Sequence, residues 1–414
     1  MARATRTAAT RTAATQTAAT QTAATPTAAT EPASAAVAGA AVAGAAVAGA
    51  AVAGAAVTVV GNPDNRRVAL FRDAARAVGA PPPVVLPWRS LLTGAPAPGP
   101  GALVRVDSPG EDAEVDRLLR GAARACEPGE IVGTAAWYDG LRAALDRLAA
   151  GAASLLNRPD DVAVMCDKRR CHAVLDAAGV PVPAALPPVR GYAELRAAMR
   201  EAGLARVFVK PAHGSSASGV LALATAGARV SAITSVELAG DRLYNSLRVR
   251  RYDREADVAA IVDRLAPDRL HVERWLPKAG LGERTIDLRV VVIAGRPSHA
   301  VVRASRTPLT NLHLGNARGD LGAVRAAVGP VGWAAAMETC VRVAACFRRT
   351  LQVGVDLMFL AGWRRHAVAE VNAFGDLLPG VLAEGRDTYA AQLLALATGE
   401  YERWCRAGEV SCAT

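Results

Sequence analysis

The sequence predicts a small α/β domain followed by a longer α+β region, behind a low-complexity N-terminal leader. Strand-like and helix-like segments alternate between residues 57 and 150, which is typical of a parallel sheet covered by helices. Strand pairs joined by short turns dominate the rest of the chain, as in an α+β fold. The leader consists of short repeats that lack side chains large enough for a core. The 414 residues allow two or three domains.

We expect the leader, residues 1–56, to be disordered. Its repeats "TAATQ" and "AVAGA" have a period that fits neither a helix nor a strand. Residues 33–60 carry no charge and are long enough to span a bilayer, but they contain no Leu, Ile or Phe, which disfavours insertion. A secretory signal would place its apolar region nearer the start, whereas this one begins after Pro32. The sequence therefore favours a soluble, cytoplasmic protein without a membrane segment.

The composition argues against a nucleic-acid partner. The formal charge is +10, but aromatic residues make up only 4% of the chain and the arginines are scattered, so no base-stacking surface is expected. A nucleotide-like anionic ligand fits the positive charge better. The seven cysteines include no C-x-x-C pair, which favours reduced thiols over a disulfide framework or a zinc site.

Only three of the 48 basic residues are lysines: Lys168, Lys210 and Lys278. A chain that uses arginine for most positive charges is expected to keep lysine where a compact ammonium group is required. The three lysines are therefore candidate site residues, and the alternative is retention by chance.

The first domain is predicted at residues 57–150. Ser108 is expected to cap a helix, with Pro109 at its first position and Glu111 completing a capping box. In chain order we expect a strand at 57–60, a helix at 67–78, a strand at 83–88, and a strand, turn and helix across 102–122.

The second region begins with a helix that Asp167 is expected to cap and Gly179 to end. The following elements are expected, in order, as strand–loop–strand at 206–224, a strand within 269–280, a hairpin at 285–305, a helix at 332–351 and a hairpin at 353–376.

The last hairpin carries a candidate metal site. Glu370 and Asn372 share one face of their strand, and Asp356 on the partner strand falls within cross-strand reach of Glu370. Two carboxylates and an amide are the hard oxygen ligands that Mg²⁺ favours. The alternative is a polar strand face in water, which the neighbouring Val, Ala and Phe side chains disfavour.

A Gly/Ser-rich loop follows the strand that carries Lys210. Free amide groups and hydroxyls in such a loop can bind phosphates, and the lysine supplies a point charge. The alternative is an ordinary hairpin turn. The candidate phosphate ligands of this loop are Gly214, Ser215, Ser216 and Gly219.

Two further segments contain candidate residues. The strand "HVERWL" offers extended backbone to an adenine edge at Glu273, Trp275 and Leu276, and its alternative is an ordinary strand end with Trp275 in the core. Arg289 and Arg303 alternate with apolar residues on the hairpin at 285–305, so both are expected to point at one anion. Asn311, in the polar loop that follows, is a candidate substrate contact.

In this order, the segments resemble the ATP-grasp superfamily over about residues 57–385. The chain is most similar to RimK-type amino acid ligases, glutathione synthetase and D-alanine–D-alanine ligase. The resemblance implies an ATP-grasp region at 151–385, followed by a C-terminal helix and tail at 386–414. Within the ATP-grasp region it implies a central lid subdomain at about 185–275 and a catalytic subdomain at about 276–385. The matching stretches are "MCDKRR", "FVKP", "HGSSASGV", "ERWL", "DLRVVVIAG", "TNLHLG" and "VGVDLMF…AEVN".

Residue roles follow from this resemblance. Lys168 and Lys210 match the two ATP lysines, the carboxylates and amide of the last hairpin match the magnesium ligands, and Arg289, Arg303 and Asn311 fall on the phosphate and substrate side. Glu283 is a candidate for the ribose. "PLT" and "AFG" replace the family's Phe-Arg and Ser-Pro-Gly beside the acceptor, so the resemblance does not identify the substrates.

The resemblance implies an ATP-dependent carboxylate–amine ligase that forms an acylphosphate. It implies two Mg²⁺ ions, which Mn²⁺ can replace, and small-molecule or peptide acids and amines as partners. The alternatives are an ATP-grasp small-molecule kinase and a non-catalytic nucleotide-binding protein. The sequence does not specify the oligomeric state.

Overall fold

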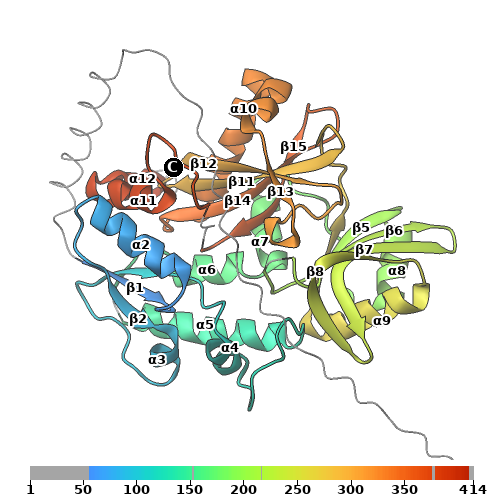
Figure 1. Cartoon of the computed structure of the whole chain (residues 1–414), viewed down its shortest axis with the longest axis horizontal. Helices are drawn as coiled ribbons and strands as arrows, with labels where there is room; N and C mark the ends of the chain where they lie inside the picture. The colour runs from blue at the N-terminus through green and yellow to red at the C-terminus, as the bar shows by residue number, and fades with distance from the viewer. Residues whose placement is uncertain (1–55, 152, 216, 375–377, 410–414) are drawn as a thin grey trace, which may run out of the picture. The chain divides into compact units, whose positions relative to one another are not determined.

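The structure, a computed structural model, describes residues 56–409 except 152, 216 and 375–377. All of these residues belong to one compact unit of the chain. The leader predicted to be disordered lies outside the described residues, apart from Ala56. Three sheets organise the described part (Figure 1): an N-terminal, a central and a C-terminal sheet.

The N-terminal sheet is parallel, as the alternating pattern predicts. Its strand order is β2-β1-β3-β4, and helices connect the strands. The core contains Trp88, Val104 and Leu141. The elements are β1 (Val57–Gly61), α2 (Arg66–Ala77), β2 (Val84–Pro87), α3 (Trp88–Leu92), β3 (Leu103–Val106), α4 (Ala113–Arg120), α5 (Thr134–Ala150) and β4 (Ser154–Leu155).

The predicted cap at Ser108 is wrong. The helix begins at Ala113, four residues after the predicted first position, Pro109, because Asp112 accepts hydrogen bonds from the backbone amides of Glu114 and Val115. Ser108 instead closes a tight turn by accepting from the Gly110 amide. Glu111 has a left-handed backbone conformation (φ 67°), which changes the direction of the chain between that turn and the helix.

The central sheet is antiparallel, with strand order β8-β7-β6-β5-β9. Two helices cover it and bury Leu195, Leu221 and Ile261. The elements are α8 (Tyr192–Glu201), β5 (Arg206–Pro211), β6 (Leu221–Ala226), β7 (Arg229–Ala239), β8 (Arg242–Tyr252), α9 (Glu255–Leu265), the 3₁₀ helix η1 (Ala266–Asp268) and β9 (Leu270–Arg274).

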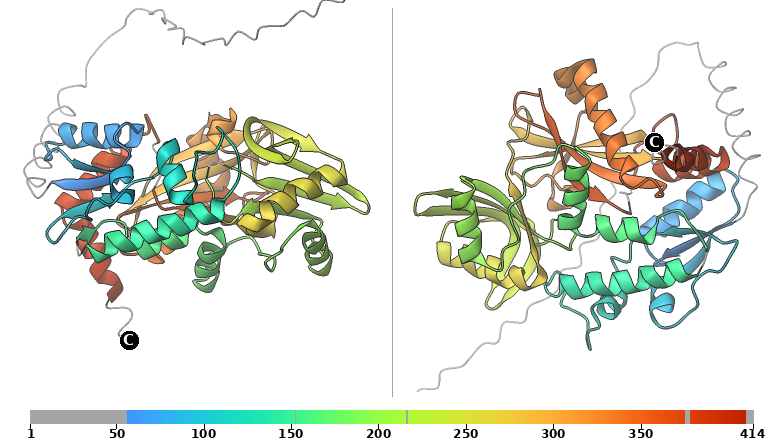
Figure 2. Two further views of the ribbon diagram at one scale, coloured as in Figure 1. Left: turned by 90° about the horizontal axis from the view of Figure 1, so that it is seen from below. Right: turned by 180° about the vertical axis from the view of Figure 1, so that it is seen from behind.

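The C-terminal sheet has strand order β13-β12-β11-β14-β15, with β10 paired to β11. It lies next to the central sheet (Figures 1 and 2). Its elements and the helices around it are α6 (Pro159–Met165), α7 (Lys168–Ala177), β10 (Gly280–Leu281), β11 (Arg284–Ile293), β12 (Arg296–Ser305), η2 (Leu312–Leu314), β13 (Ala317–Gly319), α10 (Leu321–Ala345), β14 (Gln352–Phe359), β15 (His366–Asn372), α11 (Thr388–Ala397) and α12 (Glu400–Glu409).

The helix predicted at 332–351 is wrong at both ends. α10 starts at Leu321, where the Asp320 side chain caps it. It continues across a kink at Gly329 and Pro330, because the positive φ of Gly329 (74°) reorients the chain just before the proline removes an amide donor. It ends at Ala345, before the buried strand β14.

We expect Gly295→Ala to destabilise the protein by about 2–4 kcal/mol. Gly295 lies in the turn that connects β11 to β12 and has φ +76°. A Cβ at this position would lie 2.2 Å from the Trp404 ring of α12. Strain and steric overlap therefore add. Gly227→Ala is the control, because Gly227 has φ +60° but open space around it. Equal losses in urea-induced unfolding of the two variants would contradict the overlap.

Two features of the described residues concern membrane spans and disulfides. None of its helices is long and apolar enough to cross a membrane. Its six cysteines are all free thiols.

Candidate active site

Five charged side chains form one row across four strands of the C-terminal sheet. Arg303 lies opposite Asp287, and Arg289 lies opposite Asp356. Asp356 in turn lies opposite Glu370, which confirms the cross-strand pair predicted from the sequence. Because side chains alternate along strands, all five lie on one face.

Arg289 and Arg303 do point at one anion, as predicted, and this anion is the carboxylate of Asp356. Arg289 donates to both oxygens of Asp356, with its Nη2 3.3 Å from Oδ2. The Nη2 of Arg303 lies 3.0 Å from the same Oδ2, and its Nε donates to Asp287 at 2.7 Å. Asp356 is therefore neutralised by two guanidinium groups.

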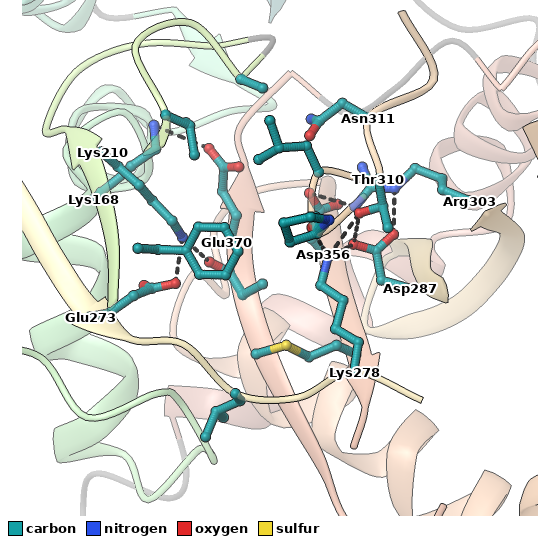
Figure 3. A pocket seen from close by; sticks show the side chains of 18 of the residues that line it. Lys168, Lys210, Glu273, Lys278, Asp287, Arg303, Thr310, Asn311, Asp356 and Glu370 are labelled. Atoms are coloured by element: carbon teal, nitrogen blue, oxygen red, sulfur yellow. Dashed lines mark hydrogen bonds and ion pairs between the residues drawn. The ribbon is translucent and has the colours of Figure 1, made fainter. Parts of the chain in front are cut away.

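Two lysines approach the row from other elements (Figure 3). Lys168 stands at the first position of α7, which Asp167 caps, and its Nζ lies 3.2 Å from Glu370 Oε1 and 2.6 Å from the carbonyl oxygen of Gly214. Lys210, from β5, lies 2.6 Å from Glu273 Oε1 and 3.3 Å from the carbonyl oxygen of Ala369. The structure thus brings together the residues predicted to contact phosphate and metal.

Burial and ion pairing compete at these groups. Burial disfavours the ammonium of Lys210, but Glu273, Glu370 and Asp356 outweigh burial and raise its pKa. Burial likewise opposes ionisation of Glu273, but Lys210 and a histidine lower its pKa to about 2. For Glu370, the charges of Lys168, Lys210 and Arg289 outweigh burial and lower the pKa. All of these groups are charged at neutral pH, in compensating pairs.

An open pocket of about 710 Å³ lies between the central and C-terminal sheets. Phe208 and Met358 supply apolar surface within it. The predicted site residues that line it are Lys168, Lys210, Gly214, Ser215, Glu273, Leu276, Arg303, Asn311, Asp356 and Glu370.

Other predicted residues lie outside this lining. Glu283 is exposed and lies 3.6 Å from Arg306, away from the pocket. The Trp275 ring packs against Phe208 at a tilt of 51°, with ring centroids 5.5 Å apart. Arg289 and Asn372 lie next to lining residues, beside Gly354. Gly219 serves the loop conformation, and Ser216 lies outside the described residues.

The Gly/Ser loop is anchored at both ends. At its start, the ring of buried His213 stacks on Tyr138 at 4.0 Å, and the amide of Lys168 donates to the Ala212 carbonyl at 2.9 Å. At its end, Gly219 has φ +72°, and a Cβ there would lie 2.5 Å from Pro211 Cγ. Only glycine fits this position, which explains the residue without a ligand contact.

Sequence reasoning missed a second polar cluster in the pocket. Lys278 Nζ lies 2.8 Å from both Asp287 Oδ2 and Thr310 Oγ1, and all three residues line the pocket. The scarcity of lysine had marked Lys278 as a candidate without a role. Asp287 could have been found as well, because it shares a strand face with Arg289.

The donor set fits a hard divalent cation. The described residues contain no group of three or more His, Cys, Asp or Glu side chains that could hold a metal ion. Metal binding would therefore depend on Asp356, Glu370, the Asn372 amide and oxygens of a ligand, the arrangement that Mg²⁺ commonly uses with phosphates. The buried amide nitrogen of Asn372 has no hydrogen-bond partner within the described residues.

Comparison with known proteins identifies the fold. No protein-family model and no curated protein matches the sequence. Among solved structures, D-cycloserine synthetase DcsG matches with a TM-score of 0.53 and 16% identity, over 84% of this chain and 100% of its own. The ATP-grasp ligase PsnB, complexed with minimal precursor, Mg and ADP, gives 0.49 and 17%, over 83% and 97%. A RimK-domain ATP-grasp protein from Sphaerobacter thermophilus gives 0.46 and 18%, over 82% and 99%. The chain has an ATP-grasp fold, as its sequence motifs predict.

Proposed function

We propose that the protein is a cytoplasmic, ATP-dependent ligase that joins a carboxylic acid to an amine. One observation carries this proposal: the ammonium groups of Lys168 and Lys210 and the carboxylates of Asp356 and Glu370 converge on a single pocket. Such a set of charges suits a metal-bound triphosphate. The acid and amine are small molecules or peptides.

In the proposed reaction, a substrate carboxylate oxygen attacks the γ-phosphorus of ATP, the bond between that phosphorus and the β,γ-bridging oxygen breaks, and ADP leaves as the acylphosphate forms. The amine nitrogen then attacks the acyl carbon, phosphate leaves, and the nitrogen loses a proton. Lys168, Lys210 and Arg303 stabilise the negative charge that shifts between phosphate oxygens. Two Mg²⁺ ions, or Mn²⁺ in their place, would supply charge neutralisation at those oxygens.

The protein's contribution is orientation and exclusion of water. Strands position the metal ligands, and residues of the anchored Gly/Ser loop line the same pocket. No protein nucleophile is required, because the phosphoryl and acyl groups pass between substrates.

The test is an ATP-consumption screen with the full chain, Mg²⁺, and pairs of amino acids, short peptides and polyamines. A ligase releases ADP only when acid and amine are both present, and mass spectrometry finds a product equal to their sum minus water. A kinase yields one substrate with an added phosphate. Absence of Mg-ATP binding, measured by calorimetry, would overturn the proposal.

A further inference from the structure

A second cavity, of about 360 Å³, adjoins the nucleotide pocket. The two cavities share Ala369 and the ion-paired residues Lys168, Lys210, Glu273 and Glu370, so the ion pairs lie between them. The far side of these ion pairs contains His271 together with other residues that play no part in the proposed chemistry.

His271 is connected to the nucleotide site by a chain of short contacts. Its Nε2 lies 3.0 Å from Glu273 Oε2, and Glu273 Oε1 lies 2.6 Å from Lys210 Nζ. The strand register supports this geometry, because Lys210 and His271 lie directly opposite each other on β5 and β9. Glu273 follows two residues later on the same face. All three side chains are buried.

The imidazole acts as a neutral donor. Burial lowers the pKa of His271 despite the neighbouring carboxylate, so the ring is uncharged at neutral pH and its Nε2–H donates to Glu273. Both carboxylate oxygens of Glu273 are then used inside the protein. The Glu273 side chain therefore holds Lys210 in place.

We propose that His271 is a positioning residue of the ATP site, which fixes Glu273 so that Glu273 holds the Lys210 ammonium toward the pocket. This inference rests on the proposed function and deepens it. Without the imidazole donor, one oxygen of a buried carboxylate loses its partner, and Glu273 and Lys210 gain freedom to adopt other rotamers.

Three variants test the proposal. His271→Phe removes the donor and keeps a ring, and His271→Gln restores an N–H donor. His172→Phe is the matched control, since its ring lies 5.2 Å from that of His271 in the same cavity but is hydrogen-bonded to the Pro183 carbonyl, at 2.7 Å. We expect His271→Phe to weaken Mg-ATP binding and raise the KM for ATP about tenfold with kcat little changed. His271→Gln should recover most of the affinity.

A second measurement needs no nucleotide. The chain has only three lysines, so labelling by acetic anhydride can be followed at each one by mass spectrometry. His271→Phe should raise the labelling rate of Lys210 severalfold relative to Lys278, while His172→Phe leaves the ratio unchanged.

The outcomes separate the two proposals. Normal ATP affinity and normal Lys210 labelling in His271→Phe would overturn the positioning role, as would equal losses in His172→Phe. If the wild-type protein does not bind Mg-ATP, the proposed function is overturned. If His271→Phe nevertheless raises the labelling of Lys210, the His271–Glu273–Lys210 linkage is retained.

Discussion

Replacing Glu370 with glutamine is expected to change ATP affinity in opposite directions with and without Mg²⁺. With Mg²⁺, the loss of a metal ligand should weaken binding and lower the rate of ATP consumption about 10²–10³-fold. Without Mg²⁺, the same change should strengthen ATP binding about tenfold, or about 1.4 kcal/mol.

The second effect follows from the ion pairs in the structure. Lys168 pairs with Glu370, and Arg303 pairs with Asp356, so carboxylates already occupy the cations that a triphosphate needs. Metal-free ATP must break these pairs and leave the carboxylates beside its own negative charge. Glutamine at position 370 removes the carboxylate that pairs with Lys168, so that the ammonium charge is available to the triphosphate.

The measurement is isothermal titration with ATP, in Mg²⁺ and in EDTA. Glu338→Gln is the control, because this residue is exposed on α10 and should change neither affinity. A loss of affinity in both buffers would mean that Glu370 does not compete with the triphosphate for Lys168.

The sequence predicts the parts of this site that depend on local pattern. The alternation of β15 places Glu370 and Asn372 on one face, and the "AGW" turn brings Asp356 within cross-strand reach of Glu370. A β-bulge between Asp356 and Leu357, which the sequence pattern does not reveal, sets the pairing of Asp356 with Glu370. The scarcity of lysine is also a local property, and it marks Lys168 and Lys210 without any structure.

What the sequence does not predict depends on contacts between distant segments. The Lys278–Asp287–Thr310 cluster joins a loop, a strand and a second loop whose approach no periodicity reveals. Arg289 and Arg303 were expected to bind an anionic ligand. In the structure they pair with Asp356, because a buried carboxylate requires a counter-charge and these guanidinium groups supply it. The roles and domain boundaries assigned by resemblance remain predictions.

The sequence also misplaced two helix starts for a common physical reason. Ser108 and Asp112 are both good capping residues, and the helix begins at the one whose carboxylate reaches two free amides. Pro330 is compatible with a helix start, but Gly329 allows a kink that joins it to an earlier helix. Candidate caps compete, and the choice depends on the three-dimensional path of the chain.

Asp287→Asn is expected to destabilise the C-terminal sheet by about 3–5 kcal/mol at neutral pH. Asp287 is buried and pairs with Arg303 at 2.7 Å and Lys278 at 2.8 Å. Removal of its charge leaves the buried ammonium of Lys278 with only neutral oxygens in place of the carboxylate, among them the Thr310 hydroxyl. Urea-induced unfolding measures the loss, with Asp64→Asn as the exposed control of the same chemistry.

The pH dependence of the unfolding free energy distinguishes the loss of the Asp287 charge from a change in the packing of its side chain. Burial opposes ionisation of Asp287, but Arg303 and Lys278 outweigh it and hold the pKa below its ordinary value of about 4. A carboxyl group whose pKa is lower in the folded state stabilises it fully above the unfolded pKa, and this stabilisation is lost as pH falls toward the folded pKa. The difference between wild type and Asp287→Asn should therefore be constant from about pH 7 to 5 and shrink below about pH 4. A difference that does not change with pH would show that packing of the side chain, and not its charge, holds Lys278 and Arg303 in place.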